Sequence, residues 1–151
     1  MQSLDVCGCF QVDDAVLVDI LTRCSQLKYL DIENCRKISD KGVDALVGSK
    51  RKLDSINIGG DFNITSTGLK KFITSFPHLR NLRHLHVSGL DINDSIIYSI
   101  VDYCKDLESL SISFADISEA ALNTLLDRFG NNNCIIQLLF YFSYSLLCLN
   151  G

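Results

Sequence analysis

The chain has 151 residues and a net charge of −4, and 47% of its residues are apolar and 21% charged. This length allows one domain or one compact repeat array, and the composition excludes a disordered, collagen-like or Pro-rich chain. Nucleic-acid binders usually carry a basic surplus, so a pI near 5.2 argues against nucleic acid as the partner.

The cysteines indicate a compartment. There are seven of them, an odd number, and the first ten residues, MQSLDVCGCF, lack the basic and apolar regions of a secretory signal. Paired disulfides are typical of secreted chains, so this pattern predicts a reducing environment, in the cytoplasm or the nucleus.

An internal repeat organises the chain. The segment that begins at Leu27 reads LxxLxLxxCxxIxDxGVxxL, and the same slots recur on both sides of it. Five copies follow in chain order, at about 1–26, 27–52, 53–81, 82–106 and 107–131, and are numbered 1 to 5 below. Copy 3 is longer because residues 76–79, Phe-Pro-His-Leu, form an extended loop between helix and strand.

Each copy changes its hydrophobic period midway. The front half alternates with period 2, which predicts short strands near 4–6, 29–32, 55–58, 84–87 and 109–112. The back half has apolar residues at helical spacing, which predicts an amphipathic helix. Candidate N-caps of these helices are Ser39 or Asp40, Asn93 or Asp94, and Ser118.

The repeat predicts an α/β solenoid. One strand and one helix cannot bury a core alone, so the copies must stack, with a parallel sheet on the concave side and helices on the convex side. Residues 1–131 are expected to form this solenoid. A single buried column should run through Leu30, Ile56, Leu85 and Leu110.

The pattern resembles the cysteine-containing leucine-rich repeat family, which carries one Cys before the strand and one after it. Cys24 and Cys104 occupy the first slot, and Cys9 and Cys35 the second. The hydrophobic-Ser/Thr-Asp element that follows appears as residues 38–40, Ile-Ser-Asp. The departures are Lys50 and Leu79 in the first slot, and Asp61, Leu90 and Ala115 in the second.

The resemblance implies a function. Repeats of this type are most often found in F-box/leucine-rich-repeat proteins, the substrate receptors of SCF-type cullin-RING ubiquitin ligases. It therefore implies non-catalytic protein–protein recognition, with cullin-RING components among the partners. The chain has no F-box segment, so we expect a fragment, a truncated isoform or a repeat-only relative. The alternative is a repeat scaffold in a signalling or cytoskeletal assembly unrelated to ubiquitin.

Catalysis and metal binding receive little support. Phosphate-binding, dinucleotide-binding, hydrolase and zinc-protease motifs are missing from the sequence, and an open solenoid offers a groove rather than a closed pocket. Cys9 and Cys35 hold equivalent slots, which favours buried structural cysteines over a metal site, while Cys7 should face outward. We expect no enzyme activity, no catalytic residues, no cofactor and no metal.

The concave face is the predicted binding surface. Side chains alternate along a strand, so the residues that flank each buried pair point outward. The candidate binding residues are Asp5, Tyr29, Asp31, Glu33, Asn57, His84, His86 and Ser111. The N-terminal end of this set is acidic and has one large aromatic residue. A basic, extended partner segment is therefore expected across copies 1 and 2.

Residues 132–151 form an apolar C-terminal tail. Its repeat slots are degenerate, with Gln137, Phe140 and Phe142 at the positions of the strand pattern. Three hypotheses remain: a hydrophobic cap over copy 5, a non-native tail from alternative splicing or read-through, and a tail anchor. The stretch is shorter than the about 20 residues of a spanning helix, so membrane association is not expected.

Overall fold

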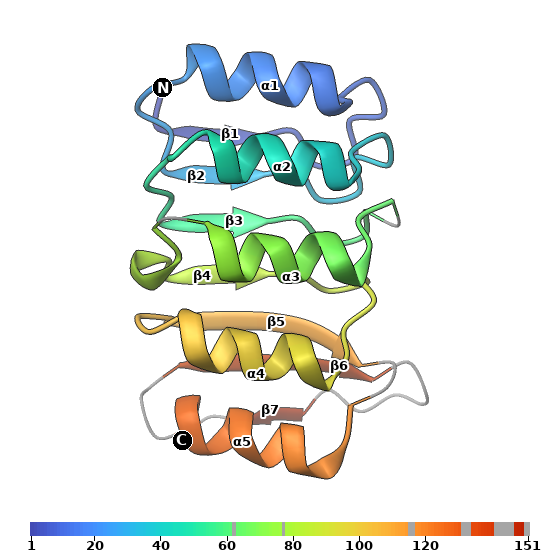
Figure 1. Cartoon of the computed structure of the whole chain (residues 1–151), viewed down its shortest axis with the longest axis vertical. Helices are drawn as coiled ribbons and strands as arrows, with labels where there is room; N and C mark the ends of the chain where they lie inside the picture. Colours follow the sequence, from blue (N-terminus) through green and yellow to red (C-terminus); the bar gives the residue numbers. More distant parts are fainter. Residues whose placement is uncertain (62, 77, 115–116, 131–133, 141–146, 150–151) are drawn as a thin grey trace.

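Strands and helices alternate between residues 3 and 140 (Figure 1). The computed structural model describes residues 1–61, 63–76, 78–114, 117–130, 134–140 and 147–149. The strands are β1 (Ser3–Asp5), β2 (Tyr29–Asp31), β3 (Ser55–Asn57), β4 (His84–His86), β5 (Ser109–Phe114), β6 (Ile135–Phe140) and β7 (Leu147–Leu149). The helices are α1 (Asp14–Arg23), α2 (Asp40–Gly48), α3 (Ser66–Ser75), α4 (Asp94–Tyr103) and α5 (Glu119–Phe129).

The strands form one sheet in sequence order, and the helices cover one of its faces (Figure 1). β1 to β6 pair in parallel, and β7 pairs antiparallel with β6. The predicted α/β solenoid, its parallel sheet and its five strand–helix copies are therefore confirmed. The long loop of copy 3 holds a short 3-10 helix at Leu79–Asn81, while Pro77 lies outside the described residues.

The predicted column of aliphatic residues forms the centre of the core. Leu30 pairs in register with Ile56, Ile56 with Leu85 and Leu85 with Leu110. Their exposed fractions are 2%, 0%, 0% and 1%. Full burial of one such side chain contributes about 1.5–3 kcal/mol. The column is thus a major stabilising element and fixes the register of every copy.

A left-handed turn follows the strand in each of the first four copies. Gly8, Asn34, Gly60 and Gly89 have φ of 69°, 58°, 71° and 80°. Glycine reaches this region without strain and asparagine tolerates it better than most residues. The turn redirects each strand toward its helix at the same point, so the helices stack in line.

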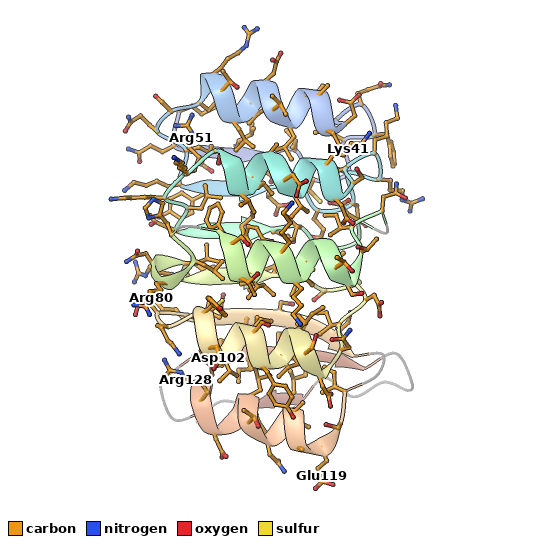
Figure 2. The ribbon with its side chains drawn as sticks, in the orientation of Figure 1. Lys41, Arg51, Arg80, Asp102, Glu119 and Arg128 are labelled. Atoms are coloured by element: carbon orange, nitrogen blue, oxygen red, sulfur yellow. The ribbon has the colours of Figure 1, made fainter. Side chains whose placement is uncertain are left out.

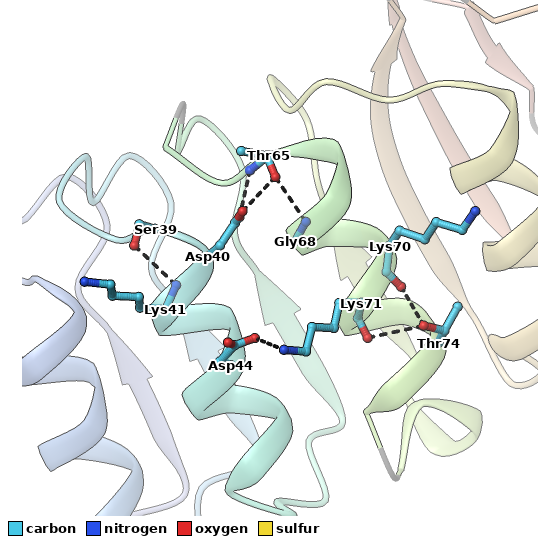
Figure 3. Close-up of polar contacts among 9 residues, drawn as sticks. All are labelled: Ser39, Asp40, Lys41, Asp44, Thr65, Gly68, Lys70, Lys71 and Thr74. Carbon is cyan, nitrogen blue, oxygen red and sulfur yellow. Dashed lines mark hydrogen bonds and ion pairs between the residues drawn. The ribbon is translucent and has the colours of Figure 1, made fainter.

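Hydrogen bonds tie the starts of α1, α2 and α4 to the next copy. Ser39 and Thr65 are the N-caps of α2 and α3. The carboxylate of Asp40 accepts from the Thr65 backbone N–H at 2.8 Å and from the Thr65 hydroxyl at 2.7 Å (Figure 3). Asp14 binds Ser39 in the same way, at 2.8 and 2.7 Å. We call this arrangement the Asp clasp.

The clasp recurs once more and is interrupted once. Asp94 accepts from the backbone N–H of Ser118 at 2.8 Å and from its hydroxyl at 2.6 Å. In copy 3 the equivalent residue is Ser66, and within the described ranges no hydrogen bond joins it to Asn93, the N-cap of α4. Of the paired N-cap candidates, Ser39 and Asn93 are the caps, because Asp40 and Asp94 serve the following copy instead.

The sheet continues into the apolar C-terminal segment. β6 extends β5 in parallel, with Ile136 beside Leu110 and Leu138 beside Ile112. The expected placement of Phe140 in the Leu110 slot is wrong, because the alternation that buries Ile136 and Leu138 sets the register. Phe142 lies outside the described residues. The three hypotheses for residues 132–151 stay open, and among the described helices none is long and apolar enough to cross a membrane.

Candidate functional site

The outward residues of five strands form ladders on the face opposite the helices. Asp5 pairs with Asp31, Asp31 with Asn57, Asn57 with His86 and His86 with Ser111. A parallel ladder runs through Ser3, Tyr29, Ser55, His84 and Ser109. Sequence reasoning thus placed these residues on one face and in the right order.

Asn57 organises the acidic end of this face. Its side-chain amide donates to Asp31 Oδ2 at 3.0 Å and to Glu33 Oε2 at 2.9 Å. Asp31 Oδ1 accepts from the Glu33 backbone N–H at 2.9 Å, and Asp5 Oδ1 accepts from the Cys7 backbone N–H at 2.9 Å. These bonds hold the carboxylates in fixed positions, and no signal in the sequence pairs Asn57 with both of them.

A hollow of about 300 Å³ opens over β1 to β4. Its lining residues are Ser3, Leu4, Asp5, Tyr29, Leu30, Asp31, Ser55, Asn57 and His86. Tyr29 is 44% exposed and forms an aromatic wall, while Leu30 beneath it is buried. The hollow therefore combines carboxylates with apolar surface.

Histidine and serine replace the carboxylates over β4 and β5. His84 Nδ1 lies 3.0 Å from Ser109 Oγ, and Ser88 Oγ lies 2.8 Å from Ser111 Oγ. Burial lowers the pKa of His86, and the neighbouring His84 lowers it further. Ser111 is only 5% exposed, so this predicted binding residue offers little surface to a partner.

One group of possible metal ligands lies beside the hollow. The ligand atoms of Cys7, Asp31 and Glu33 are within 4.8 Å of one another. Desolvation raises the pKa of the Cys7 thiol, as do Asp31 and Glu33, which disfavours the thiolate that metals bind. Both carboxylates are already bound by Asn57. The sequence analysis did not foresee this group, in which Cys7 and Glu33 hold the same slot of adjacent copies and Asp31 lies two residues before Glu33.

The cysteine slots differ between copies. Cys35 is buried and donates to the Val6 carbonyl oxygen at 3.2 Å, as expected for a structural cysteine. Cys7 is exposed, as predicted. The expectation that Cys9 is buried is wrong: Cys9 is exposed, because β1 is an edge strand and no further strand pairs on its outer side in the described structure.

Asp61 is a buried carboxyl group in the interior, in the slot that Cys35 fills in copy 2. It is 0% exposed, and neither carboxyl oxygen has a hydrogen-bond partner. Burial raises its pKa to about 7, with further contributions from Glu33 and Asp31. The sequence signal was the exchange of cysteine for aspartate, although the spacing alone could not show that the carboxyl lacks a partner.

Known proteins are similar to this chain in sequence. The family model that matches residues 23–47 is described as a leucine-rich repeat. Antagonist of mitotic exit network protein 1 of Candida glabrata is 32% identical over 104 residues, covering 68% of this chain and 20% of that protein. F-box/LRR-repeat protein 4 of Bos taurus is 27% identical over 121 residues, covering 75% and 20%.

A Caenorhabditis elegans protein, EEED8.10, whose name gives RNA binding as a candidate role, is 30% identical over 118 residues. That match covers 76% of this chain and 15% of that protein. The chain thus spans no more than 20% of the length of any of these three curated relatives.

Solved structures share the fold of this chain. The tropomodulin C-terminal domain of Caenorhabditis elegans has a TM-score of 0.70 at 14% identity, covering 85% of this chain and 81% of that chain. A chain of the yeast Rad7–Elc1 complex has a TM-score of 0.61 at 20% identity, covering 80% and 30%. The repeat matched at residues 23–47 and the shared architecture therefore agree: the fold is that of leucine-rich repeats.

Proposed function

We propose that the chain is a non-catalytic recognition module that holds an extended protein segment across its concave face. The observation that carries this proposal is the cluster of Asp5, Asp31 and Glu33 beside the exposed Tyr29. Asp5 is exposed, and Asp31 and Glu33 are partly buried. None of the ion pairs in the described ranges involves these three carboxylates. A basic partner segment would supply the missing charge.

The finer proposal is substrate selection for a cullin-RING ubiquitin ligase, in the cytoplasm or nucleus. The similarity to an F-box/LRR-repeat protein supports it, as does the shared fold with a chain of the Rad7–Elc1 complex. In such a complex the solenoid would bind the substrate, while other components would supply the chemistry. The chain would need no cofactor, metal or catalytic residue for this role.

A signalling scaffold unrelated to ubiquitin is the second candidate. It is favoured by the 32% identity with the antagonist of mitotic exit network protein 1. Its recognition chemistry would use the same concave face, so the two candidates differ in the partners they assemble rather than in the site.

RNA recognition fits the surface poorly, despite the name of one relative. The carboxylates of the concave face would repel phosphates. In the basic run at residues 50–52, Arg51 donates to the carbonyl oxygens of Ser25, at 3.0 Å, and Leu21 at the end of α1. Figure 2 shows Arg51, Arg80 and Arg128 spread along the side where the helices end, rather than gathered in one patch.

Affinity purification with identification of the bound proteins tests the proposal. We expect cullin-RING components and a substrate with a basic segment among the bound proteins. Asp31→Lys should abolish capture of the substrate but leave capture of the cullin-RING components unchanged. Tyr29→Ala should weaken substrate binding by about 2 kcal/mol if it is a hot spot. The convex-face variant Lys70→Glu is the control.

Two outcomes would argue against these proposals. Substrate binding that survives both concave-face changes but fails in Lys70→Glu would move the site to the other face. Partners that include signalling proteins but no cullin-RING component would favour the scaffold candidate.

A further inference from the structure

We propose that the hollow over β1 to β4 is a pocket for one arginine side chain of the bound partner. This inference rests on the proposed function and names the residue type that the acidic end of the face selects. Its volume, about 300 Å³, is at the lower limit of small-molecule sites, which suits a single side chain rather than a folded element.

The carboxylates of the hollow are arranged for a planar, forked donor. Asp5 and Asp31 are register partners on adjacent strands, which lie about 4.8 Å apart in a sheet. Each has its Oδ1 fixed by the backbone N–H two residues ahead, at 2.9 Å. A guanidinium group carries donors on two edges and can bridge two such acceptors, whereas an ammonium group acts as a point charge.

Electrostatics also favours a cation here. Like charges directly opposite on neighbouring strands destabilise a sheet. Lys28 pairs with Asp54, and Lys71 pairs with Asp44 at 2.7 Å, but in the described part of the chain no Lys or Arg pairs with Asp5 or Asp31. Only neutral donors offset their repulsion, so a bound cation would relieve it.

The remaining walls suit the rest of an arginine. Tyr29, 44% exposed, supplies an aromatic ring to the lining of the hollow, and Leu4 and Leu30 line it as well. Guanidinium groups stack on aromatic faces more readily than ammonium groups do. His86 lines the hollow from β4, and its lowered pKa keeps it neutral at pH 7, so it does not compete for the site.

A titration followed by NMR tests the pocket directly. The uniformly ¹⁵N-labelled full chain is titrated with N-acetyl-arginine methylamide and, separately, with N-acetyl-lysine methylamide at the same ionic strength. We expect saturable shifts at residues 3–5, 29–33 and 55–57, with the arginine probe binding about fivefold more tightly. Asp31→Asn should weaken arginine binding about fivefold, and added salt should weaken it further.

The matched control is Asp102→Asn, which removes one exposed carboxylate on α4 (Figure 2). It should leave the titration unchanged, and the dispersion of each spectrum reports whether the variant is folded. Equal affinity for the two probes, shifts outside the hollow, or full binding by folded Asp31→Asn would each overturn the inference.

The outcomes separate this inference from the proposed function. If the arginine probe fails while partner binding remains sensitive to Asp31→Lys, the concave face binds the partner but the arginine pocket is wrong. If the probe binds in the hollow while Asp31→Lys leaves partner binding unchanged, the arginine pocket is supported and the proposed partner site is wrong.

Discussion

The two halves of the concave face share one scaffold, but one half is acidic and the other neutral. Over β1 to β3 the outward ladder is acidic, with Asp5 and Asp31 beside Asn57. Over β4 and β5 the same ladder continues as His86 and Ser111, which are neutral at pH 7. Beneath both halves the buried residues are equivalent aliphatic side chains.

The comparison shows where specificity resides. The inward residues fix strand pairing and register, so they cannot vary in polarity without loss of the core. The outward residues are free of that constraint, and their charge alone distinguishes the halves. Changes on the ladder should therefore alter recognition, whereas changes beneath it should alter stability.

The largest expected effect tests the shared scaffold. Leu30→Ala in the acidic half and Leu85→Ala in the neutral half should each lower the free energy of unfolding by about 2–5 kcal/mol, since both side chains are buried. Urea denaturation measures the change. An unaltered unfolding midpoint for Leu85→Ala would contradict the repeat register and with it the common scaffold.

Asp61 should make stability depend on pH. Its folded-state pKa of about 7 lies above the ordinary value of 3.8, so the folded state retains the proton longer. The stability gained from holding this proton is fully present below about pH 4 and is lost as pH rises through about 7. The free energy of unfolding of Asp61→Asn should therefore match that of the parent near pH 4 and exceed it at pH 8 by up to about 4 kcal/mol.

Unfolding midpoints measured from pH 4 to 8 check this. Asp127→Asn, which changes an exposed carboxylate on α5, is the control and should keep the slope of the parent. A parent and an Asp61→Asn variant with parallel pH profiles would show that the buried carboxyl does not titrate in this range.

On the convex side, the Asp clasp can be compared with a simple ion pair on the same helix. Asp40→Ala removes two hydrogen bonds to Thr65 and should cost about 1–2 kcal/mol, as the loss of a helix cap does. Asp44 lies on α2, as Asp40 does, and forms an exposed ion pair with Lys71 of α3 (Figure 3). Asp44→Ala removes only this ion pair and should cost less than about 1 kcal/mol. Equal losses would mean that the clasp adds nothing beyond its charge.

The smallest expected effect concerns His86. Burial and His84 lower its pKa, while Asp31 and Glu33 act in the opposite direction, so it gains charge only at acidic pH. Protonation would place a cation in the lining of the hollow and weaken binding of the arginine probe about twofold between pH 7 and 5. A His86→Gln variant should lose this pH dependence, and an unchanged dependence would assign it to another group.

Much of the fold was predictable from the sequence. The recurrence of Leu30, Ile56, Leu85 and Leu110 predicted both the strands and their register, because a shift by one residue would expose every one of them. The alternation of side chains then placed Asp31 and His86 on the open face. The alternation within each strand predicts which side chains are buried, and its recurrence in five copies supports the same register each time.

Only the tertiary structure decided contacts between copies. Asp40 could have capped its own helix, yet it binds Thr65 of the next copy because stacking brings the two helix starts together. Asn57 bridges Asp31 and Glu33, and Asp61 lies buried without a partner, only once copies 2 and 3 are packed. The charge of each residue is set by the sequence, but the partner that it meets depends on distances between copies, which no single repeat contains.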